Sequence, residues 1–317
     1  MAKFKFTPKQ RKEILFCYAV LLIPVCFHLV FFLYVNIDNI FLSFQQVTSL
    51  KGDRDWVQPH IFANYAKVIE SFTSEGEGGY VANSIKNSFT MWWTNFIISN
   101  PLYLIFSYYV FRKYVGGKAF GILTMVPNIV SGMVFGLCFQ KVVELALPEL
   151  MESFFDLKEF PNLLSKDVED RDFSLLWGTG IFYMIWLSFG MQVLIYSNAM
   201  NAIDDEIFES ARLDGVNDRQ EFFSIVLPII WPTVSTFLVT GVASMFTVSG
   251  PWLVFFQWGA PPEVWGFSYW MNLKIKTEMD SPIDYPVVAA AGYMVSIASL
   301  PLVFFTRWVT NKVDKND

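Results

Sequence analysis

One short polar segment has residue types and a spacing that fit docking to another protein. It reads Glu209-Ser210-Ala211-Arg212-Leu213-Asp214-Gly215, and nine residues later the chain continues Ile225-Val226-Leu227-Pro228. A carboxylate such as Glu209 forms a charge-assisted hydrogen bond with a basic partner, and such a bond is stronger than a neutral one. The chemistry that these side chains offer is therefore recognition of a partner.

The residues before and within this segment predict a short surface helix. Asp204 and Asp205 stand where the helix should begin, as N-cap and first-turn anions facing the positive end of the helix dipole. Ile203, Ile207 and Ala211 recur at a spacing of four and form a narrow apolar stripe. The other face is mostly acidic, whereas a helix that lies on anionic lipid prefers Lys and Arg there. Docking into a basic groove of a partner is therefore favoured over an interfacial membrane helix.

A sharp turn and a second helix should follow. Gly215 is expected to end the first helix, because only glycine enters the left-handed conformation cheaply at this capping position. Asn217 can cap the next helix, with Gln220 three residues later completing a capping box. Pro228 and Pro232 can loosen or bend the apolar stretch that comes next. Together these features predict a stiff lever that carries force from the short helix into a membrane span.

Long stretches without formal charge place the chain in a membrane. It is 54% hydrophobic and 16% charged, with a mean hydropathy of +0.39, whereas soluble domains carry about 25% charged residues. Six charge-free stretches each exceed the roughly 20 residues that cross a hydrocarbon core about 30 Å thick. We expect an all-α, polytopic membrane protein with about six transmembrane helices, in residues 14–37, 87–111, 119–140, 173–203, 225–256 and 285–306.

The distribution of Lys and Arg predicts the orientation of these spans. With the N-terminus inside, the inner segments hold thirteen of the 23 Lys and Arg residues, and the longer outer segments hold nineteen of the 29 Asp and Glu residues. The positive-inside rule then puts both termini in the cytoplasm. The expected organisation is a basic cytoplasmic arm (1–13), a transmembrane domain (14–310) whose inner loop (204–224) carries the docking segment, and a cytoplasmic tail (311–317).

Polar and aromatic side chains inside the later spans are candidates for a solute path. Polar groups within a membrane are costly and mark either a path or a contact between helices. An aromatic set with hydroxyl and amide groups suits a neutral sugar, because rings stack on its C–H faces and short polar groups bind its hydroxyls. Ordinary helix contacts and interfacial aromatic residues are the alternative for each position. The candidates are Trp186, Ser188, Gln192, Ser244, Thr247, Ser249, Trp252 and Tyr293.

The groups missing from these spans restrict the function further. The fourth, fifth and sixth spans contain no Asp, Glu, Lys, Arg or His, so they offer no proton relay or buried cation site of the kind an ion-driven transporter uses. The sequence also has no G-x4-G-K-[ST] phosphate loop. We therefore expect no catalytic residues, no metal site, no cofactor and no nucleic-acid partner, with any ATP hydrolysis on a separate subunit.

The docking segment resembles the E-A-A-x3-G-x9-I-x-L-P loop in the permease subunits of ATP-binding-cassette importers of type I, and it departs from that pattern only at Ser210. Further elements resemble the sugar-type permeases of this class. They are Phe62-Ala63-Asn64-Tyr65 for F-x-N-Y, the stretch 83–88, Trp186 with Phe189-Gly190, and Gly259-Ala260-Pro261 in place of G-G-P. The resemblance covers about residues 14–310.

This resemblance implies a membrane-spanning subunit in a bacterial or archaeal cell membrane. Its implied partners are ATPase subunits, a second homologous permease in a heterodimer, and an extracytoplasmic solute-binding protein. The residues carried over as the ATPase-coupling set are Glu209, Ser210, Ala211, Arg212, Asp214 and Gly215. Three readings stay open: import of a sugar or oligosaccharide, import of another small solute such as an amino acid or polyol phosphate, and a scaffold that docks a soluble partner without transport.

Overall fold

The computed structural model describes residues 8–49, 52–73, 79–155, 160–164, 173–277 and 284–314. The basic arm expected at 1–13 is therefore described from residue 8 and the tail expected at 311–317 up to residue 314. The chain forms two compact units, one from Met1–Glu70 with Lys274–Met294 and the other from Ser71–Leu273 with Val295–Asp317. The described residues are almost entirely helical, with one two-stranded sheet.

The first unit consists of a long helix and a small capping region. Helix α1 (Pro8–His28) continues through a π-helical segment (Leu29–Tyr34) into α2 (Val35–Ser43). An antiparallel hairpin follows, formed by β1 (Gln45–Val47) and β2 (Arg54–Trp56). The start of α3 (Ala63–Thr73), the end of α14 (Phe267–Thr277) and the start of α15 (Tyr285–Asp314) also belong to this unit.

The F-x-N-Y element holds this capping region together. The side-chain amide of Asn64, buried at the start of α3, donates hydrogen bonds to the carbonyl oxygens of Ser43 (2.9 Å) and Gln45 (2.7 Å). The hydroxyl of Tyr65 lies 2.8 Å from that of Ser43. Because a helix end leaves carbonyl groups without a partner, Asn64 satisfies the end of α2 and fixes the turn into the hairpin.

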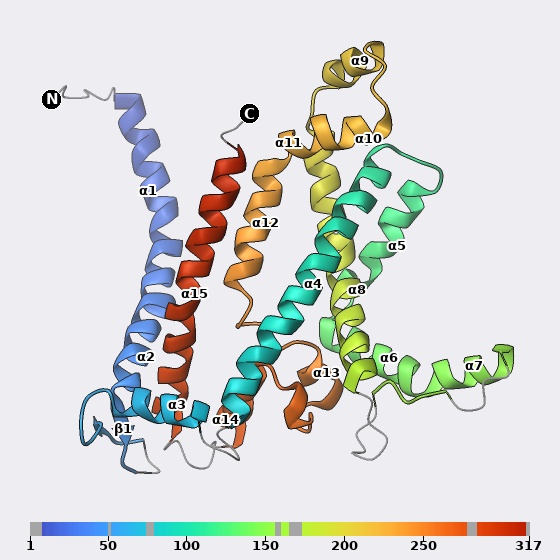
Figure 1. Ribbon diagram of the computed structural model, residues 1–317. Helices are drawn as coiled ribbons and strands as arrows, with labels where there is room; N and C mark the ends of the chain where they lie inside the picture. Colours follow the sequence, from blue (N-terminus) through green and yellow to red (C-terminus); the bar gives the residue numbers. More distant parts are fainter. Residues whose placement is uncertain are drawn as a thin grey trace. The chain divides into compact units, whose positions relative to one another are not determined.

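The second unit contains the other helices (Figure 1). Its long helices are α4 (Gly79–Phe111) and α8 (Phe173–Asn201), which form the most extensive helix pair. The remaining elements, in chain order, are α5 (Gly117–Ile129), α6 (Gly132–Lys141), a π-helical turn (Val142–Ala146), α7 (Leu147–Phe155), α9 (Asp205–Leu213), α10 (Asp218–Glu221), a π-helical turn (Phe222–Val226), α11 (Leu227–Ile229), α12 (Trp231–Ala243), α13 (Trp252–Phe256) and a 3-10 turn (Pro262–Val264), followed by the first part of α14 and the last part of α15.

The described helices agree with about six membrane spans. Three are long and apolar enough to cross a membrane alone, Lys12–Ser43, Phe173–Asn201 and Tyr285–Asp314, and two bent pairs raise the number to five. Helix α4 is less hydrophobic than these helices, but it has 33 residues and no charged residue between Lys86 and Arg112. At 1.5 Å per residue it is about 50 Å long, so it supplies the sixth span.

Two of the expected spans are broken, and their boundaries are corrected here. The span expected at 119–140 divides into α5 and α6, and the chain bends by 102° between Gly117–Ile129 and Gly132–Phe155. Val130 is extended and Ser131 has a non-helical ψ of 130°, which interrupts the helical hydrogen bonds at this point. In Figure 1, α6 and α7 consequently turn away from the direction of α5.

The span expected at 225–256 ends earlier than the sequence suggested. Its helix bends by 69° at Ile230 and finishes at Ala243, and Trp252–Phe256 forms the separate helix α13. Pro232 lies in the first turn of α12, where its missing N–H costs nothing, and Gly250 has a φ of 66° before Pro251. The chain therefore folds back into the unit after Ala243, and Trp252 and Phe255 become part of its core.

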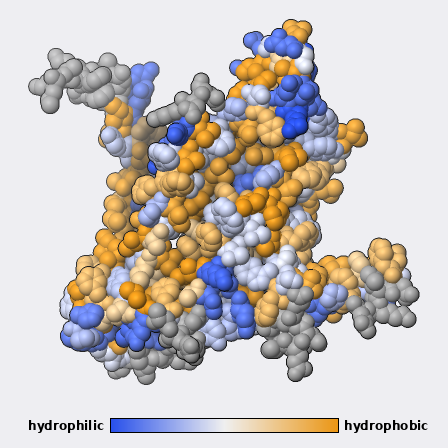
Figure 2. All heavy atoms as spheres, viewed as in Figure 1, coloured by the Kyte–Doolittle hydropathy of each residue, from blue (hydrophilic) through white to orange (hydrophobic). Residues whose placement is uncertain are grey.

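The α9–α10 end of the second unit carries hydrophilic side chains. Figure 2 shows them there, above a largely hydrophobic surface over the long helices, with further hydrophilic groups in the lower part of the view. The end of α15 belongs to the same end of this unit, because the indole N–H of Trp231 donates to the carbonyl oxygen of Thr310 at 3.1 Å. Within the second unit, the docking segment and the C-terminal part of the last helix therefore lie at the same end.

Candidate functional site

The docking segment folds as the predicted helix, turn and helix. Helix α9 ends at Leu213, and Gly215 adopts a φ of 75°. The backbone N–H of Val216 donates to the carbonyl oxygen of Ala211 and that of Gly215 to Arg212, both at 3.1 Å. This is the hydrogen-bond pattern of a Schellman C-cap. Gly215 therefore forms the turn that its type and position predicted.

The second helix begins with the predicted capping box. The Oδ1 atom of Asn217 accepts from the Gln220 backbone N–H at 2.9 Å, and the Oε1 atom of Gln220 accepts from the Asn217 N–H at 3.2 Å. At the start of α9, Asp204 has the extended backbone of an N-cap, but its side chain makes no capping hydrogen bond. Asp204 therefore occupies the predicted N-cap position, with Asp205 in the first turn as expected.

The apolar face of α9 differs from the expected stripe. Ile203 and Ala211 are buried as expected, but Ile207 is 38% exposed and Phe208 is buried in its place. The ring of Phe208 lies 5.4 Å from that of Phe111 at the end of α4. Counting four residues on from Ile203 predicts Ile207 on the buried face. The face that α4 covers contains the next residue, Phe208, instead. Leu213, 90% exposed, and Ile207 are thus apolar groups left open on α9.

The polar residues of the coupling set are exposed on and after α9. They are Glu209, Ser210, Arg212 and Asp214. Glu209 and Arg212 also line a recess of about 300 Å³ together with Arg112 and Lys113 from the end of α4. An exposed carboxylate and exposed apolar groups side by side on a short helix suit docking of a protein surface with a basic group.

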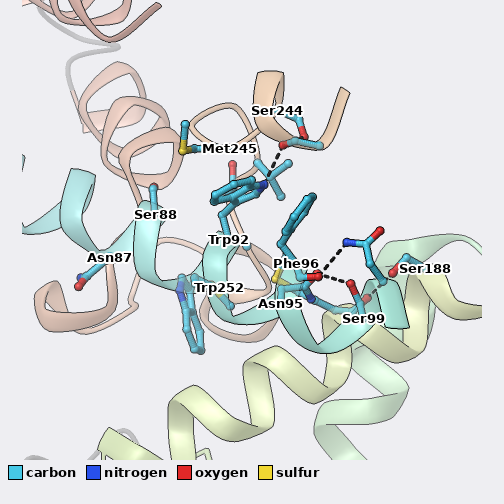
Figure 3. A pocket seen from close by; sticks show the side chains of 18 of the residues that line it. Asn87, Ser88, Trp92, Asn95, Phe96, Ser99, Ser188, Ser244, Met245 and Trp252 are labelled. Carbon is cyan, nitrogen blue, oxygen red and sulfur yellow. Dashed lines mark hydrogen bonds between the residues drawn. The ribbon is translucent and has the colours of Figure 1, made fainter. Parts of the chain in front are cut away.

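A separate cavity lies within the second unit and contains part of the predicted solute path (Figure 3). Its volume is about 280 Å³, and α4, α8 and the stretch from α12 to α13 supply most of its lining. It brings together five of the eight candidates, Ser188, Gln192, Ser244, Ser249 and Trp252. The hydroxyls of Ser249 and Ser268 lie 3.0 Å apart, and Asn272 donates to Ser249 Oγ at 3.1 Å.

The other three candidates lie elsewhere. Trp186 packs against Phe135 and Phe139, with ring centroids 5.1 and 5.9 Å away, and lines a different, apolar cavity. Thr247 is exposed and bonds the carbonyl oxygen of Ser244. Tyr293 belongs to the first unit and donates to the Asn36 carbonyl oxygen at 3.1 Å.

Sequence reasoning missed the helix that supplies the largest share of the cavity. Nine of the 22 lining residues come from α4: Asn87, Ser88, Met91, Trp92, Asn95, Phe96, Ser99, Asn100 and Tyr103. Several polar members of this set recur every three or four residues, which is the spacing of one helix face. That periodicity was visible in the sequence and would have predicted a polar face on the second span.

The cavity has buried polar atoms without a partner but no formal charge. The Nδ2 atom of Asn95 and the Oε1 atom of Gln192 are buried and have no hydrogen bond within the described part of the chain. The 22 lining residues include no Asp, Glu, Lys, Arg or His. Figure 3 shows Asn95, Ser99 and Ser188 close together on one side of this space. A buried donor and a buried acceptor left open are costly unless something binds them.

Comparison with known proteins assigns the chain to a family. The profile of the binding-protein-dependent transport system inner membrane component family matches residues 77–315. The multiple sugar-binding transport system permease protein MsmF of Streptococcus mutans is 24% identical over 72% of this chain and 73% of its own length. The arabinooligosaccharides transport system permease protein AraP of Bacillus subtilis is 26% identical over 74% of this chain and 70% of its own.

A Mycoplasma pneumoniae protein described as a probable ABC transporter permease is 30% identical, and that alignment spans about half of each protein, 48%. Among solved structures, a bacterial alginate ABC transporter in complex with an alginate pentasaccharide-bound periplasmic protein has a chain with the same fold. Its TM-score is 0.76 at 19% identity, and the match covers 97% of this chain and 98% of that one. Because the family profile spans three quarters of the sequence, this chain belongs to the binding-protein-dependent transport system inner membrane components.

Proposed function

We propose that this chain is the membrane-spanning permease subunit of an ATP-driven importer that takes up a neutral sugar or oligosaccharide delivered by an external binding protein. The observation that carries this proposal is the uncharged cavity with its open amide groups at Asn95 and Gln192. A sugar hydroxyl both donates and accepts a hydrogen bond, so it fits a site that offers one unpartnered donor and one unpartnered acceptor.

The character of the lining supports a neutral ligand over a charged one. A carboxylate or phosphate inside a low-dielectric cavity needs a paired cation or several strong donors, and this chain supplies no cation there. The relatives MsmF and AraP are named for sugars and arabinooligosaccharides. The readings as an importer of an amino acid or of a polyol phosphate fit this lining less well, since both solutes carry charge.

The cavity volume supports contact with only part of a longer ligand. Ligand pockets commonly measure about 300–1,000 Å³, and this one measures about 280 Å³. Trp92 and Trp252 present indole rings among its serine and amide groups. A second homologous permease subunit would complete the path, and the proposed assembly is a heterodimer.

The exposed residues of α9, the docking helix, support an ATPase partner on the cytoplasmic side. Glu209, Ser210 and Ala211 lie on α9, and Asp214 and Gly215 form its end. With the proposed orientation both termini and this helix face the cytoplasm, in keeping with the excess of Lys and Arg in the inner segments. ATP hydrolysis is assigned to the partner, and this chain is proposed to act as the pore-forming subunit.

The proposal is tested by uptake and binding with defined solutes. The complex is purified from membranes through a tag on this chain and reconstituted with its binding protein in vesicles. We expect an ATPase subunit and a second permease to co-purify, and neutral oligosaccharides such as maltose or arabinooligosaccharides to stimulate ATP hydrolysis and enter the vesicles. Alginate oligosaccharides, which carry carboxylates, should not. Stimulation by charged solutes alone would contradict the neutral-sugar assignment, and a complex without an ATPase would contradict the importer assignment.

A further inference from the structure

A buried ion pair joins the second helix of the docking segment to α4. Glu221, the last residue of α10, has a side chain only 2% exposed although it carries a carboxylate. Its oxygens lie 3.3 Å from the Arg112 guanidinium and accept a hydrogen bond from the Tyr108 hydroxyl at 3.0 Å. Tyr108 lies on the last turn of α4, and Arg112 directly follows that helix.

Neighbouring groups extend this contact into a network. Arg112 also lies 3.6 Å from Asp218 at the start of α10, and the Tyr108 hydroxyl approaches the Asp218 carbonyl oxygen. The phenol of Tyr114 donates to the Asp218 carboxylate, and this hydrogen bond raises the pKa of Tyr114 above its ordinary value. Burial lowers the pKa of the Arg112 guanidinium, but the nearby Glu221 and Asp218 carboxylates outweigh this effect. The pKa of Arg112 is therefore raised above its ordinary value, and the guanidinium is charged. Both ends of the short helix α10 are therefore held to α4.

The helix held in this way is α4, which supplies the largest share of the cavity lining. Tyr103, the last α4 residue lining the cavity, lies five residues before Tyr108, which is about 7.5 Å along the helix axis. The Tyr103 hydroxyl is 2.6 Å from Ser188 Oγ on α8, and Ser107 Oγ donates to the Val193 carbonyl oxygen. A displacement of α10 would thus reach the cavity through α4 and its hydrogen-bonded neighbour α8.

The covalent route from the docking segment into the membrane has a break. From α10 the chain continues through α11 to Ile230, where it bends by 69° before α12 begins. Pro232, in the first turn of α12, has no N–H to offer a carbonyl oxygen in the preceding turn. The side-chain link to α4 bypasses this break.

We infer that the Glu221–Arg112 pair, together with Tyr108, is a positioning element that passes movement of the docking segment to α4 and so to the cavity. This inference rests on the proposed function, because it requires that a partner ATPase moves α9 and α10. It assigns a role to residues outside the docking helix and outside the cavity. When two sites are allosterically coupled, binding at one typically changes the affinity of the other by about 5- to 150-fold. The loss of this link should therefore be measurable.

The test follows the cavity directly in the assembled complex. Ser99 lines the cavity on α4, and Ser99→Cys in a background with Cys17, Cys26 and Cys138 replaced by Ser gives a single reporter. Its reaction rate with a small thiol reagent is measured with and without a non-hydrolysable ATP analogue. We expect the nucleotide to change the rate in the otherwise unmodified complex and to have about tenfold less effect in Glu221→Gln.

Two further variants separate transmission from folding. In the double variant Glu221→Met, Arg112→Met no buried charge is left unpaired, and apolar replacement of a buried pair is often neutral for stability. It should assemble with the ATPase, hydrolyse ATP, and still lose the nucleotide effect at Ser99→Cys and most of its solute uptake per ATP. Arg219→Gln is the control, since Arg219 is exposed on the same helix and has no ion pair within the described residues.

The outcomes are distinguishable. A double variant with a normal nucleotide effect would overturn the inference, because packing alone would then carry the movement. The inference would also be overturned if the fully assembled double variant lost ATP hydrolysis and solute uptake in equal proportion. A complex with a normal nucleotide effect on the Ser99→Cys reaction rate that takes up no neutral sugar would contradict only the proposed substrate. A complex that contains no ATPase partner would contradict only the proposed assembly.

Discussion

Gly190 of α8 lies directly against the backbone of Thr124 in α5. A Cβ atom added at Gly190 would overlap the carbonyl oxygen of Thr124 and crowd the N–H of Met125. Small residues allow membrane helices to approach this closely. The glycine that resembles a family element in the sequence therefore has a physical reason: it sets the distance between two helices of the second unit.

Gly190→Ala should destabilise the subunit by about 1–3 kcal/mol, the usual range for overpacking. The matched control is Gly178→Ala on the same helix, where an added Cβ would meet nothing within 4 Å. We expect a lower thermal unfolding temperature in detergent for the first variant and an unchanged or slightly higher one for the second. Equal melting temperatures for the two variants would refute the close-approach explanation.

Gln192→Met tests the cavity as a ligand site. The buried Oε1 atom of Gln192 lacks a hydrogen bond within the described residues, so its removal should leave stability unchanged or raise it. Solute affinity should fall by about 1–3 kcal/mol if this oxygen accepts from a ligand hydroxyl. Solute-stimulated ATP hydrolysis, measured against solute concentration, checks this. The matched control is Thr247→Val, which changes a candidate residue outside the cavity and should leave the concentration dependence intact.

The sequence predicted some parts of this structure closely because the determinants are local. Gly215 and the Asn217–Gln220 capping box act over three to five residues, and both have the expected geometry. The break after Ile129 was missed, because a run without charges indicates membrane depth but not the direction of the chain. The Ser131-Gly132 pair, a dipeptide typical of turns, was a local signal at this point, but counting charges alone does not use it.

Contacts between residues far apart in the chain could not be predicted from the sequence either. Glu221 reads as one more acidic residue of an inner loop until the end of α4 places Arg112 beside it. Phe208 and Ile207 are equally apolar neighbours, and only the position of Phe111 decides which is buried. The polar face of α4, by contrast, was readable from its periodicity, and Asn95 belongs to it.

The orientation of the spans is tested by labelling from outside. With the native cysteines replaced by serine, Asp55→Cys in the exposed strand β2 should react with an impermeant thiol reagent on intact cells. Asn311→Cys, exposed near the end of α15, should react only after permeabilisation. The opposite pattern would overturn the placement of both termini in the cytoplasm.

Gly215→Val tests the turn after α9. A β-branched residue at a φ of 75° costs about 1–2 kcal/mol in left-handed strain, and the turn should open. We expect uptake to fall while the subunit still inserts, because the spans are unchanged. Asn tolerates this conformation far better, so Gly215→Asn should retain most of the uptake. Full uptake by Gly215→Val would show that the turn geometry does not matter.

Glu209→Lys tests the charge of the docking helix. Glu209 is exposed on α9 and lines the recess beside α4, so a basic group on the ATPase can reach it and form a charge-assisted hydrogen bond. Reversal should loosen the complex through like-charge repulsion, and Glu209→Gln should have a smaller effect. Glu206→Lys makes the same change of charge on the same helix, away from that recess, and separates a specific contact from a general effect of net charge. The measurement is co-purification of the ATPase with each variant alongside solute uptake. If Glu209→Lys behaves like Glu206→Lys in both assays, Glu209 is a solvated surface carboxylate and the docking contact lies elsewhere on α9.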